Sequence, residues 1–534
     1  MLQICNEVLF QIFDYLTASD KEICIRVYEQ LLFNKYFQEY KSRRNQVHRL
    51  RISLYGNASH VNGILALPEQ FQHLREFVYR HNKDDRNESD ISKIVIDERV
   101  AQHWQGITTF HIDDKYLVSS KLLQYGGFCN LVELGVRFGG SERSELKCNA
   151  LIQYLSNAPK LKILNLDHGK MSIGHFYQLH CNAQQLEVLS FHDMDLASRD
   201  VNKQERLIAS SNTLTELRLL QCSQEFNESM LGRTEYSNLK ILQVHISEIH
   251  DEKYGEDQLI EFVSHCQYLQ NYDVSIYPIT PAIVKAMDAS GIKLKELTIL
   301  SLYDMNPLNQ VGCLRASNQI CSILKMTIDY SYYQKYKKIQ FRKLFNHLKG
   351  FPNLKHLNMV VISDNHFPSL PFDVLLTKCR NLETLELKYW RIQIGFKLFN
   401  RSVIIPRRKF TTKLKALVLH EVIDSDNSIK FISTTCPGLS KLTIFPKYNG
   451  YFPNIHFPNH NFASIKVDRP DRSIYHSNAY YYQVTDEKGT KWYKMLNGIQ
   501  EKTFEEFPTI SEKNRMFSLT YKNCTTLQLG DTYI

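Results

Sequence analysis

The stretch LKILNL, residues 161–166, decides the fold of this chain, because the same phrase returns along most of its length. Each copy has a leucine, two variable residues, a second leucine or apolar substitute, one variable residue, and a third apolar residue. Clear copies begin at Leu161, Leu186, Leu214, Leu239, Leu294, Leu354, Leu382, Leu414 and Leu439. Weaker copies begin at Leu50, Leu74, Ile107, Leu131, Leu269, Cys321 and Phe462, and successive copies start 23 to 33 residues apart.

The spacing inside the phrase predicts a strand. Leu164 and Leu166 are two residues apart, so on a strand they point to the same face, and the residue between them points to the other. One strand cannot bury that face alone, but stacked copies share a continuous core. A period of one strand plus one return segment is typical of leucine-rich repeats. We therefore predict an α/β fold: a leucine-rich-repeat solenoid with a curved parallel sheet and outer helices.

The segments that return the chain between strands carry apolar residues at helical spacing. Good examples are residues 150–160, 258–268, 373–381 and 429–438. Cys266, Cys379 and Cys436 each stand three residues before the first leucine of a copy, where we expect a small buried side chain. Cys222 stands eight residues after Leu214, where this repeat type often places Asn or Cys at the turn. These segments predict the outer layer of the solenoid.

Composition and length fit one long solenoid without a membrane segment. The 534 residues are 43% hydrophobic, which is ample for a core, and a solenoid grows along one axis instead of dividing into compact domains. No apolar run approaches eighteen residues, and the start MLQICNEVLF does not look like a signal peptide. The 12 cysteines are dispersed and predict reduced thiols. We expect a cytoplasmic or nuclear protein that does not contact membranes.

The first 45 residues break the repeat and predict a small helical unit. Val8, Leu9, Ile12, Phe13 and Leu16 lie on one stripe of a helix. Residues 19–22, SDKE, form a capping box that predicts a second helix. A unit of this size exposes more apolar surface than it can bury internally. Either a partner protein or the solenoid has to cover this surface. If the solenoid covers it, the unit is a cap for the first repeat.

Residues 6–16, NEVLFQIFDYL, resemble the opening of an F-box, and residues 19–31 resemble its second half. Cys5 and Leu31 stand where the family has proline and tryptophan. An N-terminal F-box before leucine-rich repeats is similar to the F-box/leucine-rich-repeat proteins, the substrate receptors of SCF-type ubiquitin ligases. The resemblance implies that one apolar stripe binds a Skp-type adaptor, which holds the cullin and RING subunits. The implied adaptor-binding residues are Leu2, Ile4, Val8, Leu9, Ile12, Phe13 and Leu16.

The same resemblance implies that this chain is not an enzyme and takes no cofactor. Its role would be to hold an unidentified protein substrate on the repeats, so that substrate lysines meet the charged conjugating enzyme. A scaffold that works independently of a ligase is the alternative. Strand geometry predicts which residues face the concave, substrate-binding side. They are Glu216, Arg218, Gln243, His245, Asp273, Glu386 and Lys388, followed by Trp390 in the same repeat as the last two.

Two rival functions receive less support. Residues 331–350 and 407–415 are basic, with interleaved aromatic residues in the first stretch, which is one pattern for nucleic-acid binding. A net charge of +9 spread over 534 residues is dilute, so we expect a solvated helix face and no specific nucleic-acid binding. Phosphate-loop, nucleophile-elbow, zinc-protease and dinucleotide motifs are missing from the sequence. His456 and His460 lack a third ligand nearby, so we predict a turn and no metal site.

These patterns divide the chain into three predicted parts. Residues 1–45 form the F-box-like helical unit, residues 46–468 the solenoid, and residues 469–534 a β-rich C-terminal cap. Within the cap, residues 480–484 and 492–495 flank a turn and predict a β-hairpin. CTTLQL, residues 524–529, predicts a last repeat.

Overall fold

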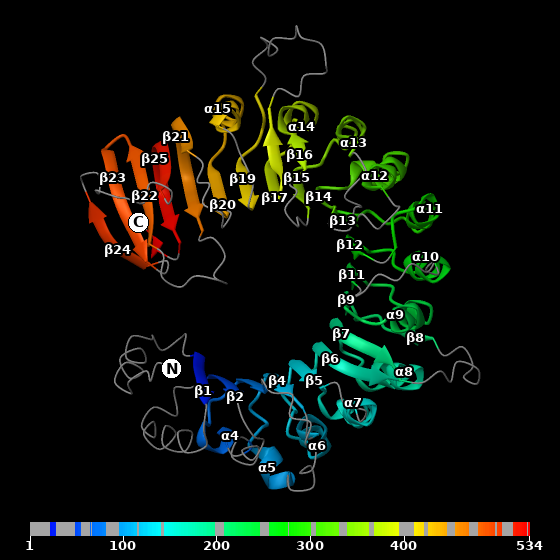
Figure 1. Ribbon diagram of the computed structural model, residues 1–534. Helices are drawn as coiled ribbons and strands as arrows, with labels where there is room; N and C mark the ends of the chain where they lie inside the picture. The colour runs from blue at the N-terminus through cyan, green and yellow to red at the C-terminus, as the bar shows by residue number, and fades with distance from the viewer. Residues whose placement is uncertain are drawn as a thin grey trace. The chain divides into compact units, whose positions relative to one another are not determined.

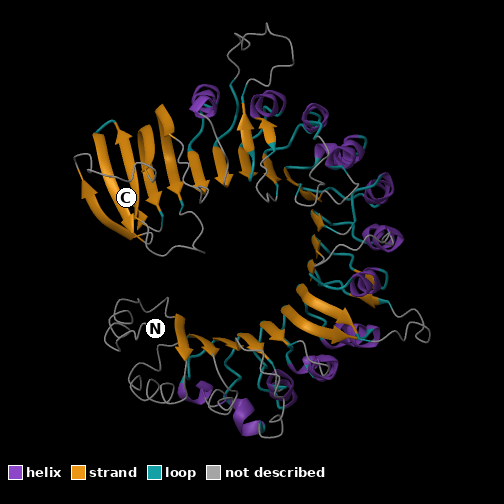
Figure 2. Ribbon diagram, in the orientation of Figure 1, coloured by secondary structure: helices purple, strands orange, loops and turns teal. Residues whose placement is uncertain are grey.

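The computed structural model describes residues 22–27, 48–54, 65, 67–81, 96–114, 117–139, 144–197, 208–245, 256–275, 277–300, 306–330, 339–361, 368–394, 411–420, 426–445, 454–468, 479–496, 499–504, 516–530 and 532–533. The chain forms two compact units, Met1–Leu269 and Gln270–Ile534. Each unit is a run of parallel strands with helices along one side of the sheet (Figures 1 and 2). The predicted boundaries at residues 45 and 468 remain predictions.

The first unit carries one parallel sheet whose strands follow chain order (Figure 1). Its strands are β1 (Glu22–Val27), β2 (Arg49–Leu54), β3 (Glu76–His81), β4 (Thr109–Asp113), β5 (Glu133–Arg137), β6 (Ile163–Met171), β7 (Val188–Leu196), β9 (Glu216–Leu220) and β11 (Ile241–His245). Consecutive strands pair in register, as Leu134 with Leu164 and Leu164 with Leu189 illustrate. A short parallel pair, β8 (Ala209–Ser210) with β10 (Thr234–Glu235), lies apart from this sheet.

Helices of the first unit fill the return segments between its strands. They are α4 (Leu67–Gln70), α5 (Glu98–Gln102), α6 (Val118–Gln124), α7 (Ser144–Gln153), the 3₁₀ turn η3 (Leu155–Asn157), α8 (Ile173–Asn182), α9 (Gln224–Leu231) and α10 (Glu256–Ser264). Two of the predicted return helices, within residues 150–160 and 258–268, are confirmed by α7 and α10. Several helices begin at a residue whose side chain accepts from a first-turn amide, such as Ser172 from His175 and Ser223 from Phe226.

The second helix predicted from residues 19–22 is wrong over Glu22–Val27, which form the strand β1. β1 pairs in parallel with β2, Ile23 with Leu50 and Ile25 with Ile52. The segment alternates apolar residues at positions 23, 25 and 27, and β-branched Ile and Val favour strands. The capping-box pattern competes with this alternation, and pairing with β2 selects the strand. The remaining F-box-like residues lie outside the described part of the chain, including the predicted adaptor-binding set Leu2, Ile4, Val8, Leu9, Ile12, Phe13 and Leu16.

The second unit continues the same pattern. Its parallel strands are β12 (Asn271–Val274), β13 (Glu296–Leu300), β14 (Lys325–Asp329), β15 (His356–Val360), β17 (Thr384–Lys388), β19 (Ala416–His420), β20 (Lys441–Phe445) and β21 (Asn454–Val467). Helices α11 (Pro281–Ala289), α12 (Pro307–Arg315), α13 (Phe341–Leu348), α14 (Phe372–Lys378) and α15 (Asp426–Thr435) and the 3₁₀ turn η4 (Asn318–Cys321) return the chain. A short parallel pair, β16 (Ser369–Pro371) with β18 (Arg391–Gln393), accompanies α14. The predicted helices within residues 373–381 and 429–438 are confirmed.

The C-terminal strands extend this sheet. β25 (Met516–Leu529) pairs in parallel with β21, and β22 (Ala479–Asp486) pairs in parallel with β25. β22 and β23 (Gly489–Leu496) form the predicted antiparallel hairpin, which β24 (Ile499–Phe504) extends, and β26 (Thr532–Tyr533) pairs with the end of β25. Phe462 lies opposite Cys524 and Ile465 opposite Leu527, so the predicted last repeat is confirmed as a parallel strand.

The apolar residues of each phrase form the core. Leu164, Leu166 and Leu387 are fully buried, and the strands alternate buried with partly exposed residues. Cys266, Cys379 and Cys436 are buried at the ends of the return segments, as predicted. Burial raises the pKa of the Cys266 and Cys379 thiols to about 12, so both are protonated structural side chains. This arrangement is a leucine-rich-repeat solenoid.

A left-handed residue stands within or directly after several strands and brings the next side chain into the core. His168, Asp193, Gln221 and Tyr389 have φ values of 54°, 51°, 55° and 63°. Each lies seven residues after the first leucine of its phrase. The residues after Asp193, Gln221 and Tyr389 are Met194, Cys222 and Trp390, all buried. None of the described helices has both the length and the apolar composition needed to cross a bilayer.

Candidate functional site

The strand residues between the buried leucines define what we call the open face, the side of each sheet away from its helices. Glu216, Arg218, Gln243 and His245 of the first unit are partly exposed there, on the adjacent strands β9 and β11. Asp273, Glu386 and Lys388 are partly exposed on the open face of the second unit. Strands β13, β14 and β15 separate Asp273 from Glu386 and Lys388, so these three are not brought together.

Trp390 is not on this face, and its prediction as a substrate-facing residue is wrong. Its side chain is completely buried, and Nε1 donates to the main-chain oxygen of Met359 over 2.8 Å. The rings of Tyr330 and Phe341 contact it edge-on, each with a centroid distance of 5.7 Å. The cause is the left-handed backbone of Tyr389, which interrupts the alternation that placed Trp390 on the open side.

In the first unit, the two predicted residues on β9 neutralise each other. The guanidinium of Arg218 donates to the Glu216 carboxylate, two residues earlier on the same face. Glu216 is the more buried partner, with 14% of its side chain exposed against 43% for Arg218. The planar guanidinium of Arg218 is therefore partly exposed to solvent, and the more buried carboxylate of Glu216 neutralises its charge.

In the second unit, Glu386 belongs to a row of side chains on β17, β19, β20 and β21. His420 Nε2 lies 2.9 Å from Glu386 Oε1. The His420 ring is stacked on Phe445, with a centroid distance of 4.1 Å and an interplanar angle of 4°. Lys466 Nζ lies 5.7 Å from the centroid of the same Phe445 ring. We name Glu386, Lys388, His420, Phe445 and Lys466 the aromatic–basic row.

Charges in this row hold the side chains in place. The hydrogen bond from His420 lowers the pKa of Glu386, against the opposing effect of burial, so the carboxylate is ionised at neutral pH. Lys388 Nζ lies 5.3 Å from the Tyr389 ring, and Lys466 Nζ pairs with Asp468 Oδ2 at 3.0 Å. A partly exposed aromatic ring beside balanced charges suits recognition of a protein surface.

Next to the aromatic–basic row, one side-chain oxygen on the open face accepts no hydrogen bond from the described residues. Asn358 lies opposite Glu386 in the register of β15 and β17. Its Oδ1 atom is shielded from solvent and has no hydrogen-bond partner among the described residues. A buried acceptor without a partner costs about 1–3 kcal/mol, which a donor from a bound ligand would recover.

Sequence reasoning missed His420 and Phe445, although a signal was present. Lys388, His420 and Phe445 each stand six residues after the first leucine of their phrases, at Leu382, Leu414 and Leu439. Parallel register brings these positions side by side. Comparing that one position across all repeats would have found the row.

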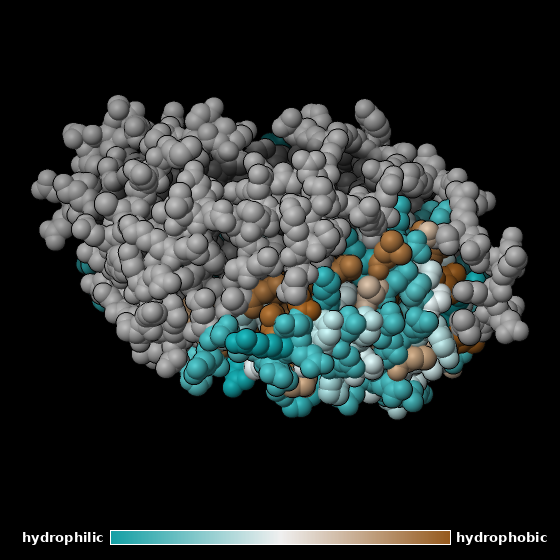
Figure 3. Space-filling view, turned by 90° about the horizontal axis from the view of Figure 1, so that it is seen from below, coloured by the Kyte–Doolittle hydropathy of each residue, from teal (hydrophilic) through white to brown (hydrophobic). Residues whose placement is uncertain are grey.

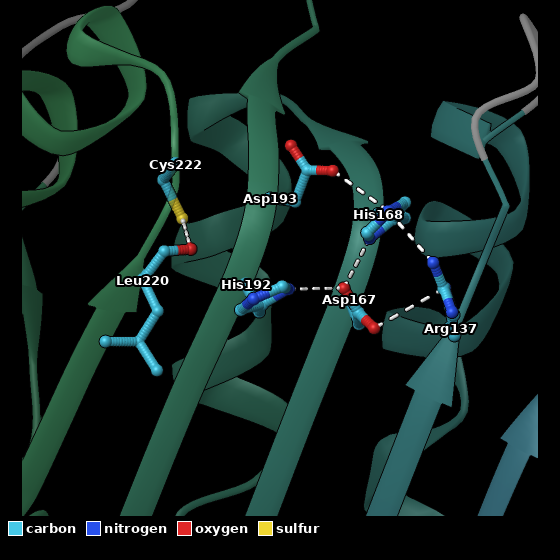
Figure 4. Close-up of polar contacts among 7 residues, drawn as sticks. All are labelled: Arg137, Asp167, His168, His192, Asp193, Leu220 and Cys222. Atoms are coloured by element: carbon cyan, nitrogen blue, oxygen red, sulfur yellow. Dashed lines mark hydrogen bonds and ion pairs between the residues drawn. The ribbon is translucent and has the colours of Figure 1, made fainter. Parts of the chain in front are cut away.

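A second cluster missed from the sequence lies on the first unit (Figure 4). Asp167 and His168 end the regular part of β6, and His192 and Asp193 occupy the corresponding places on β7. The carboxylate of Asp167 contacts both imidazoles, and Arg137 of β5 lies beside it.

The basic segment predicted as a solvated helix face behaves as expected where it is described. α13 buries Leu344, Phe345 and Leu348 and exposes Arg342 and Lys343. Because Phe345 is in the core, its ring is not available for stacking on a base. Lys337 and Lys338 lie outside the described residues. His460 lies on β21 instead of the predicted turn, buried, with Nε2 3.0 Å from the Cys436 carbonyl oxygen.

Seen from below, the coloured surface is mostly hydrophilic with small separate apolar areas (Figure 3). Apolar side chains exposed on the helices and the turns that follow them are single residues such as Tyr125, Leu146 and Tyr177. Isolated residues of this kind are normal on a soluble surface and mark no binding site.

Comparisons with known proteins return repeat proteins at low similarity. The chain is similar to the TLR13 chain of a TLR13–ssRNA13 complex, with a TM-score of 0.42 and 14% identity over 95% of this chain and 72% of that chain. An internalin, inlF from Listeria monocytogenes, gives a TM-score of 0.33 and 11% identity, covering 68% of this chain and 96% of its own. The Rad7 and Elc1 complex in yeast gives a TM-score of 0.32 and 16% identity, covering 69% and 77%.

No protein-family model matches the chain, and no curated protein matches it. At these TM-scores no ligand or partner is transferred from the neighbours. The assignment to leucine-rich repeats rests on the phrase, its burial pattern and the parallel strand register of this chain.

Proposed function

We propose that this chain is a non-catalytic binding protein that recognises a protein ligand on the open face of its second unit, around the aromatic–basic row. The supporting observation is the parallel stack of His420 on Phe445, which holds an aromatic ring partly exposed on a strand face. Aromatic side chains of this kind are the usual anchors of protein interfaces. Lys466 lies near this ring and Glu386 contacts the stacked His420, so the row carries both signs of charge, which would fix the orientation of the ligand.

Comparative affinity purification from the source cells tests this proposal. Proteins recovered with the unmodified chain are compared with those recovered with Phe445→Ala. The control is Tyr268→Ala, which removes an exposed aromatic residue, 53% exposed, away from the open face. We expect a specific protein to be lost with Phe445→Ala and kept with Tyr268→Ala. Identical recovery with all three chains would contradict the proposal.

The finer proposal is that the bound protein is a ubiquitination substrate and that this chain is the substrate adaptor of an SCF-type ligase. It is supported by the resemblance of residues 6–16 to an F-box and by the repeats that follow. In this role Leu9 and Phe13 would contact a Skp-type adaptor, and the cullin and RING subunits would supply the chemistry. The protein would act in the cytoplasm or nucleus.

A scaffold that works without a ligase is the second candidate, and β1 favours it. Strand pairing of Glu22–Val27 with β2 assigns to the sheet a segment that an F-box would use as a helix. Co-purification of a Skp-type adaptor with the unmodified chain, and its loss with a Leu9→Ala, Phe13→Ala double variant, would support the ligase role. If no adaptor is recovered and the double variant lowers the unfolding temperature, the N-terminal segment is a cap and the scaffold role holds.

A further inference from the structure

Four side chains with metal-ligand chemistry gather in the middle of the neighbouring strands β6 and β7, on the open face of the first unit (Figure 4). Asp167 Oδ1 lies 2.5 Å from His168 Nδ1 and 2.8 Å from His192 Nδ1. His168 Nε2 lies 3.0 Å from Asp193 Oδ2. One ligand atom from each of Asp167, His168 and His192 lies within 4.8 Å of the other two.

Backbone conformation explains how so many polar side chains share one face. Leu166 and Gly169 are on the core side, so the residues between them, Asp167 and His168, are both directed away from it. The left-handed φ of His168, 54°, makes this break in alternation possible. Asp193, with φ 51°, repeats the break on β7. The same left-handed break occurs at Gln221 and Tyr389, so it belongs to the repeat, and on β6 and β7 it gathers polar side chains on one face.

The contacts of this cluster bring lone-pair donors together. Asp167 Oδ1 faces the Nδ1 atoms of both His168 and His192. His168 Nε2 faces Asp193 Oδ2 and Arg137 Nη2, each at 3.0 Å. A divalent metal ion can accept lone pairs from a carboxylate oxygen and from both imidazoles at once.

We propose that Asp167, His168 and His192 bind a divalent transition-metal ion, with Zn²⁺ the best match. Two imidazole nitrogens and one carboxylate oxygen are a zinc ligand set that leaves a fourth position open. Asp193 then completes the arrangement typical of such sites, in which a carboxylate accepts from the second nitrogen of a ligating histidine.

Arg137 lies beside this site. Its Nε is 3.6 Å from Asp167 Oδ2, the oxygen that the metal would not use, and its Nη2 is 3.0 Å from His168 Nε2. When His168 Nε2 donates to Asp193 in the metal-bound form, the Arg137 guanidinium has to turn away from that nitrogen. The two carboxylates and one guanidinium leave one net negative charge around neutral imidazoles, which favours a dication. Ligand atoms around a tetrahedral zinc ion are separated by roughly 3.3 Å. The two contacts of Asp167 must open by less than about 1 Å, and the ligand atoms of the two histidines already lie within 4.8 Å of each other. Rotation of side chains that are 28–39% exposed allows this adjustment.

Metal titration of the purified full-length chain tests the site directly. The chelator-treated protein is titrated with Co²⁺, whose visible absorption reports tetrahedral nitrogen and oxygen ligation, and then with Zn²⁺ as competitor. Thiolate ligation at exposed cysteines gives separate near-ultraviolet bands. We expect one equivalent of Co²⁺ in the nitrogen–oxygen class, displaced by Zn²⁺.

Variants show which residues bind this equivalent of Co²⁺. Asp167→Asn and His192→Gln should each abolish its binding, and Asp193→Asn should lower the Co²⁺ affinity roughly 10- to 100-fold. The matched control is His111→Gln, because His111 also pairs with a carboxylate, Glu133, at 3.1 Å on the open face but has no third ligand in a described cluster. Circular dichroism checks that each variant is folded.

Retention of the same equivalent in His192→Gln, or its absence from the unmodified chain, would overturn the proposal. Since the titration needs no protein ligand, its failure would leave the proposed function of the second unit standing. Failure of the Phe445→Ala test would likewise leave the metal site standing.

Discussion

The indole N–H of Trp390 donates to the carbonyl oxygen of Met359, one repeat earlier, over 2.8 Å. This bond joins the turn after β17 to the neighbouring strand β15, and the indole is completely buried, in contact with the rings of Tyr330 and Phe341. Trp390 is therefore a structural anchor between repeats. Its aromatic character alone would suggest a ligand contact.

Removal of this anchor should destabilise the second unit. Trp390→Ala should lower the free energy of unfolding by about 3–5 kcal/mol through lost burial and the cavity left behind. Trp390→Phe keeps most of the burial but leaves the Met359 carbonyl without its donor, at a cost of about 1–3 kcal/mol. Urea unfolding measures both. Lys388→Ala, on the exposed side of the same repeat, should change stability by less than about 0.5 kcal/mol, and an equal loss there would contradict the anchor role.

An ion triad between repeats predicts an acid-dependent loss of stability. Lys415 and Lys355 hydrogen-bond to Glu383 at 2.8 Å and 3.1 Å and lower the pKa of its carboxyl to about 2. Because the folded-state pKa is depressed, the contribution is complete above about pH 4.5 and is lost as the pH falls toward 2. Glu383→Gln should lower the unfolding temperature at pH 6, and its difference from the unmodified chain should shrink on acidification. A difference that stays constant down to pH 2.5 would refute this.

The buried His180 predicts a second loss of stability in acid, in the first unit and at a higher pH than the loss at Glu383. His180 Nε2 lies 2.7 Å from the Tyr236 hydroxyl, and burial lowers the pKa of His180 to about 4. The unfolded chain binds a proton near pH 6.5 that the folded chain resists, so stability falls between about pH 6.5 and 4 and then levels off. The full effect is about 3 kcal/mol. His180→Gln should flatten this part of the curve, and an unchanged slope in urea unfolding would count against it.

Much of the fold was predictable because leucine repeats report burial directly. Leu166, Leu219 and Leu387 are buried where the phrase places them, and the hairpin and last repeat in the C-terminal segment follow from alternation and turn residues. These features depend on the local sequence pattern and on the rule that each repeat packs against its neighbours.

Other features depend on contacts that a single phrase does not encode. Residues 22–27 fit a capped helix and an alternating strand equally well, and pairing with β2 decides between them. Tyr389 adopts a left-handed backbone that reverses the side predicted for Trp390. Likewise, His420 and Phe445 are 25 residues apart and become neighbours only through the parallel register of β19 and β20.

Asparagine also joins repeats in a way that the phrase did not indicate. Asn353 and Asn381 immediately precede the first leucine of their phrases, and each donates its side-chain amide to a carbonyl of the previous repeat, Cys321 at 2.7 Å and Pro352 at 3.0 Å. Asn130 and Asn238 do the same in the first unit. An asparagine at this position therefore stabilises the stacking of repeats.

Site-specific photo-cross-linking tests the central claim, that the open face of the second unit binds a protein ligand. A benzophenone amino acid replaces Phe445 in one chain and Tyr268 in another, and both are irradiated in the source cells. We expect a discrete cross-linked protein from position 445 that is missing from position 268 and disappears when His420→Ala is added. Equal cross-linking from both positions, or none from position 445 while the folded chain is present, would contradict it.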